Sequence, residues 1–151
     1  HTAPREFFGT LNSPKLKKTL SPYGLSRELN YETPAGQRPT LNSFLLWTAK
    51  RKNMPGANLW VPIPFYLVAV DDPQAQRSVL EFLNHRFDLQ LDFGDLDQEI
   101  RKQNEKIARL RTDFPEIDQH ISKLESNVRL SEGENEKLVK QVEEFLGEMR
   151  D

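Results

Sequence analysis

Four aspartates around one glycine form an acidic cluster that could, in principle, bind a cation. They are Asp88, Asp92, Asp95 and Asp97, on either side of Gly94. Their spacing does not fit a calcium-binding EF-hand loop, which needs oxygen ligands in a fixed register and a distal glutamate. A carboxylate at Asp92 or Asp95 can instead accept backbone N–H groups at the start of the helix predicted to follow. We therefore predict helix capping here rather than a metal site.

Signatures of catalysis are missing from the sequence. It contains no G-x-x-x-x-G-K-S/T phosphate loop, no G-x-G-x-x-G dinucleotide fingerprint, no G-x-S-x-G nucleophile elbow and no H-E-x-x-H zinc pair. It has no cysteine, which excludes disulfides, thiolate metal sites and cysteine nucleophiles. His85 and His120 stand alone on predicted helices, so we interpret them as surface or core-edge residues rather than general bases. We predict no catalytic residue and no cofactor, which favours a protein that is not an enzyme.

A loop after a predicted strand is the best candidate for a small-ligand site. Residues 58–61 have the aromatic and β-branched content of a buried strand, but Pro62 cannot donate a hydrogen bond to a sheet ladder and ends it. Ligand sites in α/β sheets usually form at strand ends. The sequence therefore places a candidate site at loop 62–66. Its candidate ligand-binding residues are Pro64, Phe65, Tyr66 and Gly36.

The first 72 residues alternate between predicted strands and helices, which is typical of an α/β fold. Residues 6–11 are predicted to form a strand and residues 14–20 a helix, with proline at its first position. A second helix is predicted over residues 40–52, because its apolar residues recur at helical spacing. We expect that apolar stripe to be buried, with Trp47 as a core anchor. The stripe comprises Leu41, Phe44, Leu45 and Thr48, widened by Leu46 and Trp47.

The rest of the chain is predicted to be a helical extension, residues 73–151. Helices are expected over about residues 73–87, 95–111, 116–129 and 133–149, the last beginning at a capping box formed by Ser131 and Glu134. Narrow apolar stripes between charged faces should pair with each other or with helices of a partner. The stripe residues, which are the candidate interaction residues, are Leu96, Ile100, Ile107, Leu110, Ile117, Ile121, Leu124, Leu138, Val142 and Phe145.

Charge is distributed unevenly along the 151 residues. Residues 1–70 carry a net charge of +6, whereas residues 95–151 carry −5. The two parts should attract each other, within one chain or between copies. Nucleic acid is an unfavoured partner, because the basic residues are scattered except for short clusters near predicted helix ends. The longest apolar run, residues 59–70, is too short to cross a membrane. No signal peptide is visible, so we expect a cytoplasmic protein.

The order of four segments resembles the proteasome assembly chaperone family, in the chaperone-2-like branch and its bacterial and archaeal members. Residues 1–10 resemble that family's proline-histidine-threonine stretch and the strand after it. Residues 31–36 resemble its tyrosine and proline-glycine turn, and residues 59–66 its strand with a terminal Pro-x-Tyr. Residues 89–96, followed by charged helices, resemble its C-terminal extension. Two departures are Phe65, where the family often has histidine, and the final residues, which lack a docking tail with tyrosine.

The resemblance implies an α/β fold in which residues 1–72 form the C-terminal part of a three-layer α/β/α domain like nucleoside phosphorylases. A first βα portion would then precede His1. It also implies a non-enzymatic, oligomeric protein with an assembly-chaperone-like role, whose partners are other copies and other proteins rather than a membrane. The alternative is a nucleotide- or nucleoside-binding enzyme, ligase-like or phosphorylase-like, that uses loop 62–66.

Overall fold

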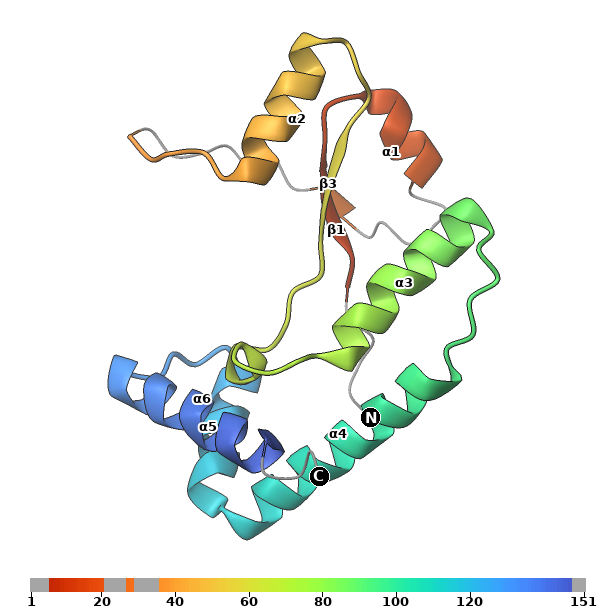
Figure 1. Cartoon of the computed structure of the whole chain (residues 1–151). Coiled ribbons are helices and arrows are strands. Elements are labelled where there is room, and N and C mark those ends of the chain that lie inside the picture. Colours follow the sequence, from red (N-terminus) through yellow and green to blue (C-terminus); the bar gives the residue numbers. More distant parts are fainter. Residues whose placement is uncertain (1–5, 21–26, 29–35, 148–151) are drawn as a thin grey trace. The chain divides into compact units, whose positions relative to one another are not determined.

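The computed structural model describes residues 6–20, 27–28 and 36–147 (Figure 1). It has a mixed helix and strand composition, which agrees with the predicted α/β class. The elements are β1 (Phe8–Leu11), α1 (Pro14–Leu20), β2 (Arg27–Glu28), α2 (Leu41–Arg51), β3 (Ala57–Trp60), the 3₁₀ turn η2 (Phe65–Leu67), α3 (Pro73–Phe87), α4 (Gly94–Asp113), α5 (Pro115–Glu125) and α6 (Glu132–Gly147).

The described residues form two compact units. The sheet unit falls in Pro4–Pro62 and Ser78–Leu91, and the helical unit in Ile63–Arg77 and Asp92–Asp151. The chain therefore passes from one unit to the other within α3. The division into domains at residue 72 stays a prediction.

The sheet unit is built on three strands in the order β2-β1-β3. β1 pairs in parallel with β2 and antiparallel with β3, where Phe8 is opposite Trp60 and Leu11 opposite Ala57. Both β1 and β3 lie within one or two residues of their predicted positions. Just after β1 and just before β3, the backbone N–H of Asn12 donates to the Gly56 carbonyl, and the Asn12 side chain accepts from the Gly56 N–H at 2.8 Å. Asn12 thus fixes the segment between α2 and β3.

The core of the sheet unit joins residues from both ends of its sequence. Phe7, Leu20 and Phe82 are its buried side chains among the described residues. The rings of Phe7 and Phe82 stack with their centroids 4.6 Å apart. Leu11, Leu16, Leu59, Val61 and Leu83 are partly buried against these three. The core therefore depends on α3, which lies far along the chain from β1.

Most of the stripe predicted to be buried on α2 is exposed, which corrects the prediction for this helix; of its members only Leu46 and Thr48 are half-buried. Leu41 is 72% exposed, and Phe44, Leu45 and Trp47 are each more than half exposed, so Trp47 is not a core anchor. The helix instead contacts the chain after it through Leu46 and Ala49, which lie close to the position a Cβ on Gly56 would occupy. The small size of this glycine lets the other face of α2 approach, and the regular stripe is left outward.

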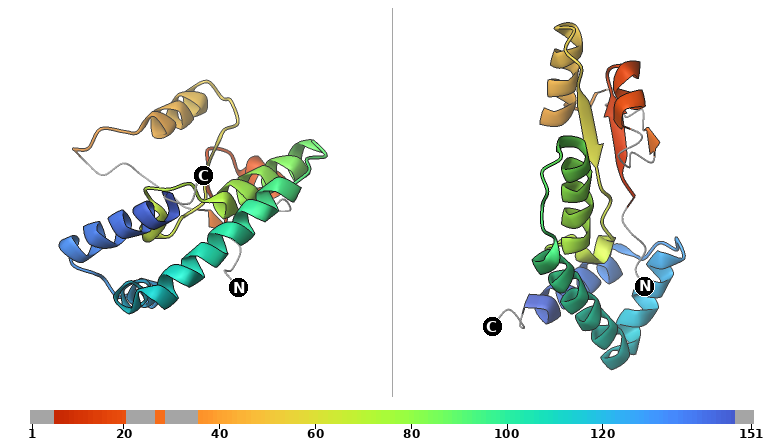
Figure 2. Two further views of the ribbon diagram at one scale, coloured as in Figure 1. Left: turned by 60° about the horizontal axis from the view of Figure 1, so that its bottom comes forward. Right: turned by 90° about the vertical axis from the view of Figure 1, so that its right-hand side faces the viewer.

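The helical unit packs α4, α5 and α6 against one another, with η2 against α6 (Figure 2). The helices begin at recognisable signals: Pro115 opens α5, and the Asp72 carboxylate accepts from the Ala75 N–H at 3.0 Å at the start of α3. Every helix among the described residues is too short or too polar to cross a bilayer.

Candidate interaction surfaces

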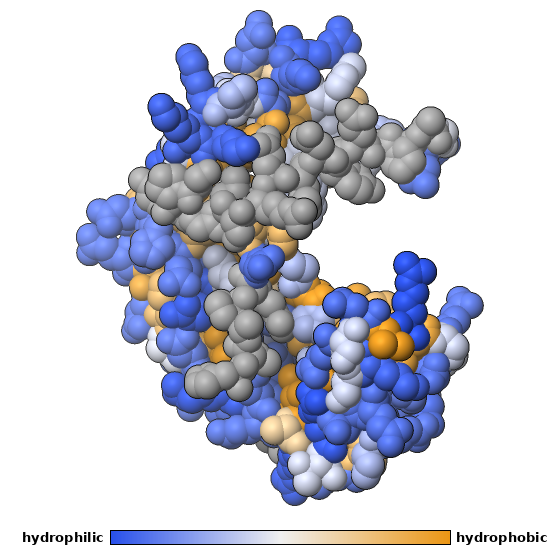
Figure 3. Space-filling view, turned by 180° about the vertical axis from the view of Figure 1, so that it is seen from behind, coloured by the Kyte–Doolittle hydropathy of each residue, from blue (hydrophilic) through white to orange (hydrophobic). Residues whose placement is uncertain are grey.

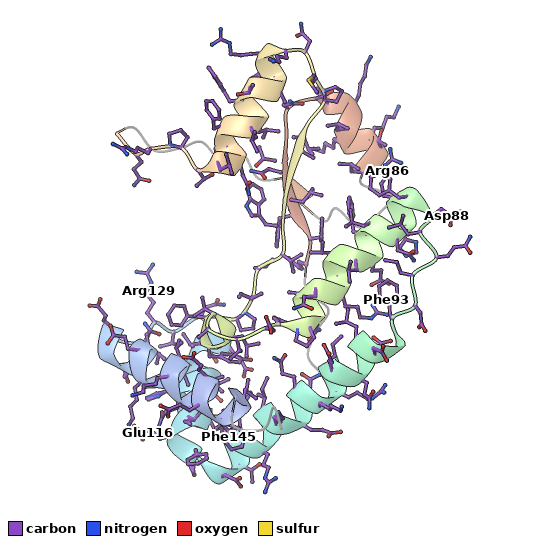
Figure 4. The ribbon with its side chains drawn as sticks, viewed as in Figure 1. Arg86, Asp88, Phe93, Glu116, Arg129 and Phe145 are labelled. Atoms are coloured by element: carbon purple, nitrogen blue, oxygen red, sulfur yellow. The ribbon has the colours of Figure 1, made fainter. Side chains whose placement is uncertain are left out.

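Most of the stripe residues of the helical unit meet in its own core. Leu110, Ile117, Ile121, Leu138 and Val142 are at most 2% exposed. Ile107, Leu124 and Phe145 pack against them and are partly buried. Phe145, labelled in Figure 4, meets the Phe114 ring edge-on at 6.2 Å. The helices thus pair with each other, and these side chains are covered by the chain itself.

The two remaining stripe residues lie on the first half of α4. Leu96 and Ile100 are half-buried and do not belong to the buried cluster of the other stripe residues. Near them, the Arg77 Nε–H donates to the Asp97 carboxylate at 2.6 Å, and the Arg77 guanidinium lies 5.2 Å from the centre of the Phe93 ring. The start of α3 is therefore bound to α4 by an ion pair and a cation–π contact.

Arg111 joins α4 to α5, which sequence reasoning did not detect. Its Nε–H donates to Asp118 at 2.5 Å, Nη1 to Glu125 at 3.0 Å and Nη2 to the Ser122 hydroxyl at 3.1 Å. Three acceptors around one partly buried guanidinium fix the angle between the two helices, because the fork of donors is rigid. The only signal in the sequence was that an arginine in the last turn of one predicted helix is followed by the acidic residues Asp118 and Glu125 in the next helix.

The predicted capping box at the start of α6 is confirmed. The Ser131 hydroxyl and backbone N–H both donate to the Glu134 carboxylate, at 2.7 and 2.8 Å, and the Glu134 N–H donates back to the hydroxyl at 3.4 Å. The hydrogen bonds from the Ser131 hydroxyl and N–H, with the nearby Lys123 ammonium, lower the pKa of Glu134 to about 2. The folded helix therefore stabilises the charged form of the Glu134 carboxylate.

Replacing Ser131 by alanine is expected to lower the Tm at pH 7 by about 2–4 °C, because the cap is lost. The pKa of Glu134 should rise toward its ordinary value. In the native chain, Glu134 stabilises the fold fully above its unfolded pKa, and this contribution is lost as the pH falls from about 4.5 toward 2. Melting curves across that range test this. An unchanged difference between native and variant chains from pH 5 to pH 2 would contradict it.

The candidate ligand-binding residues divide into buried and exposed ones. Tyr66 is 7% exposed and packs in the core of the helical unit, so little of its surface is open to a ligand. Phe65 is half exposed, and Pro64 lies just before η2. Gly36 is exposed in the sheet unit with φ +84°, in the left-handed region that favours glycine. Their ligand-binding role stays a prediction.

The structure shows contacts for two residues of the acidic cluster and for one of the predicted lone histidines. Asp92 accepts from the Gly94 N–H at 2.9 Å, in line with the predicted capping role, and Asp97 is paired with Arg77. His120 is buried, with its Nε2 3.5 Å from Glu134. No three histidine or acidic side chains of the described residues gather closely enough to hold a metal ion.

A shallow, partly apolar groove lies between η2 and α6 in the described part of the helical unit. Its volume is about 670 Å³. Figure 3 shows apolar atoms interrupting the polar surface of this unit, at the lower right. We call this depression the η2–α6 groove. It is lined by the apolar side chains of Phe65, Val68, Leu130 and Val139 and by the polar side chains of Glu132, Asn135, Glu136, Lys140 and Glu143.

A second depression of about 530 Å³ lies between α4 and the segment before α3. Its lining includes three acidic residues, Asp71, Glu99 and Glu143, and two lysines, Lys102 and Lys106. The Gln103 amide donates to the Asp71 carbonyl at 2.7 Å across it. This hydrogen bond joins α4 to the segment before α3.

The comparisons with known proteins place the chain in a family. The sequence profile of the PAC2 family matches residues 1–111. The chain belongs to the PAC2 family. This confirms the resemblance to the proteasome assembly chaperone family. Searches among curated proteins and among solved structures found no match.

The PAC2 match ends within α4, so some of the candidate surfaces lie inside the matched residues and others lie after them. α2 and η2 fall inside the matched residues, whereas α5 and α6 follow them. The η2–α6 groove therefore combines one wall from the PAC2 part of the chain with a second wall from a helix beyond it. Sequence reasoning missed this groove because its walls are about 70 residues apart. The available signal was the pair Phe65 and Val68, whose spacing of three places both on one side of a helical turn.

Proposed function

We propose that this PAC2 family chain is a non-enzymatic, oligomeric protein-interaction protein with an assembly-chaperone-like role. The observation that carries the proposal is the exposed apolar face of α2, made by Leu41, Phe44, Leu45 and Trp47. A contiguous apolar patch of this kind on a protein surface usually marks a site of protein contact. The family membership points in the same direction.

The finer features of the fold belong to the same proposal. We infer that the sheet unit represents part of a three-layer α/β/α domain, which its mixed sheet and adjoining helices support. The cytoplasm is the location that this proposal assumes. The partners are expected to be other copies of the chain and other proteins.

Light scattering coupled to size-exclusion chromatography tests the proposal, over protein concentrations of about 1–100 µM. We expect a defined oligomer that forms within this range. A monomer throughout the range would contradict it. A thermal shift of several degrees with a nucleotide and Mg²⁺, lost in Tyr66→Ala, would instead favour the nucleotide-binding alternative.

A further inference from the structure

We propose that copies of this chain associate by docking the apolar face of α2 from one copy into the η2–α6 groove of another. This inference rests on the proposed function and names the two surfaces that would carry it. Both surfaces are exposed, apolar and well formed in the described residues, and they carry opposite charges.

The docking face of α2 is a preformed helical surface. Leu41, Phe44 and Leu45 recur at the spacing of a helix face that binds in a groove, and the Phe44 and Trp47 rings stack at 6.0 Å. The Arg51 guanidinium lies 4.8 Å from the centre of the Trp47 ring and limits its freedom. Together the four apolar side chains present on the order of 400 Å². Little conformational entropy would be lost on docking, since the face is already ordered.

The η2–α6 groove has the shape and lining to receive such a face. Phe65 and Val68 on one wall are half exposed, and Leu130 and Val139 continue the apolar floor. Its volume of about 670 Å³ is enough for a few large side chains. Docking would remove apolar surface on both sides from water, which stabilises the contact in proportion to the area covered.

Charge complementarity selects a second copy as the occupant. Residues 36–62 carry Arg38, Lys50, Arg51 and Lys52 and no acidic residue. The groove is rimmed by three glutamates against one lysine. The three basic residues at the end of α2 are exposed, so they are available to the glutamates of the rim. One chain thus supplies both halves of a matched contact.

The geometry of this contact has consequences for the assembly. Because the two surfaces differ, each copy offers one face and one groove, and the contact is completed reciprocally in a dimer or around a ring. A single contact buries less than the ~1,600 Å² of a standard interface. We therefore expect weak individual contacts that sum to a stable oligomer only when they repeat.

Two single variants and their mixture test the docking by light scattering and analytical ultracentrifugation. Phe44→Glu spoils the face, and Val68→Lys spoils the groove; both positions are about half exposed, so the fold should tolerate the changes. Each variant alone is expected to weaken association at least tenfold. Their mixture should associate more strongly than either variant alone but less strongly than the native chain, because the intact face of one variant fits the intact groove of the other and each mixed pair makes only one such contact. Phe87→Glu, at another exposed aromatic residue, is the control that should associate like the native chain.

The outcomes separate this inference from the proposed function. A native oligomer that survives both variants would overturn the docking and leave oligomerisation standing, whereas a native monomer would overturn both. A mixture that associates no more strongly than either variant alone would also overturn it. Trp47→Ser and Phe65→Ser replace either variant that melts early. Reversing charge at Lys50 and Arg51 should weaken association, and reversing Glu132 and Glu136 in the mixed partner should restore it.

Discussion

Replacing Leu138 by alanine is expected to destabilise the helical unit by about 2–5 kcal/mol. Leu138 is 0% exposed and lies in one cluster with Ile121 and Val142, which are also 0% exposed. Removing its branched end leaves a cavity that rigid helices on three sides fill only in part. The destabilisation therefore combines the transfer free energy of the deleted atoms with the dispersion attraction that the side chains around the cavity no longer have.

Urea unfolding followed by far-UV circular dichroism measures the change in unfolding free energy, and hydrogen exchange locates it. We expect faster exchange in α4, α5 and α6. Val139→Ala is the matched control, because Val139 is the next residue on α6 and is only half-buried. A Leu138→Ala chain as stable as the Val139→Ala chain would show that the stripes do not form a packed core.

Local signals predicted those elements whose ends are set by their own residues. Helices α1 and α3 occupy the residues expected for them, since proline at the first position begins each one. The capping box at Ser131 and Glu134 works in the same way, because its partners are three residues apart. Such features need no knowledge of the rest of the chain.

Periodicity predicted which residues share a face, but not what covers that face. The stripes of α5 and α6 are buried, whereas the equally regular stripe of α2 is exposed. On α2, Leu46 and Ala49 lie against Gly56 in the following segment, where a Cβ would be crowded. Such a contact between a glycine and a helix face does not alter the spacing of apolar residues, so the sequence pattern does not predict it.

The sequence did not predict contacts between elements that are far apart along the chain. The Arg111 contacts and the η2–α6 groove each depend on how separate elements meet. The prolines around residues 62–64 indicate the end of a strand, and β3 ends just before them, at Trp60. The ligand-binding role of the turn after them stays a prediction, but the sequence did not show which way its side chains point. The turn directs Tyr66 into the core and leaves Phe65 outside. This single turn of 3₁₀ helix determines which of the two aromatic side chains is exposed.

Replacing Phe82 by alanine is expected to destabilise the sheet unit by about 3–5 kcal/mol. Phe82 is 5% exposed and stacks on Phe7, next to the start of β1. Only three side chains are buried in the described part of this core, so the loss of one large ring cannot be offset by repacking. β1 and α3 are far apart in sequence, and their attachment depends on this stack.

Phe87→Ala is the matched control on the same helix, because Phe87 is 61% exposed. It should change the unfolding free energy by less than about 0.5 kcal/mol, as surface substitutions usually do. Hydrogen exchange should show that the amides of β1 and β3 lose protection in Phe82→Ala but keep it in Phe87→Ala. If both variants left the β1 amides protected, α3 would not hold the sheet, and the Phe7–Phe82 stack would not be the contact that joins them.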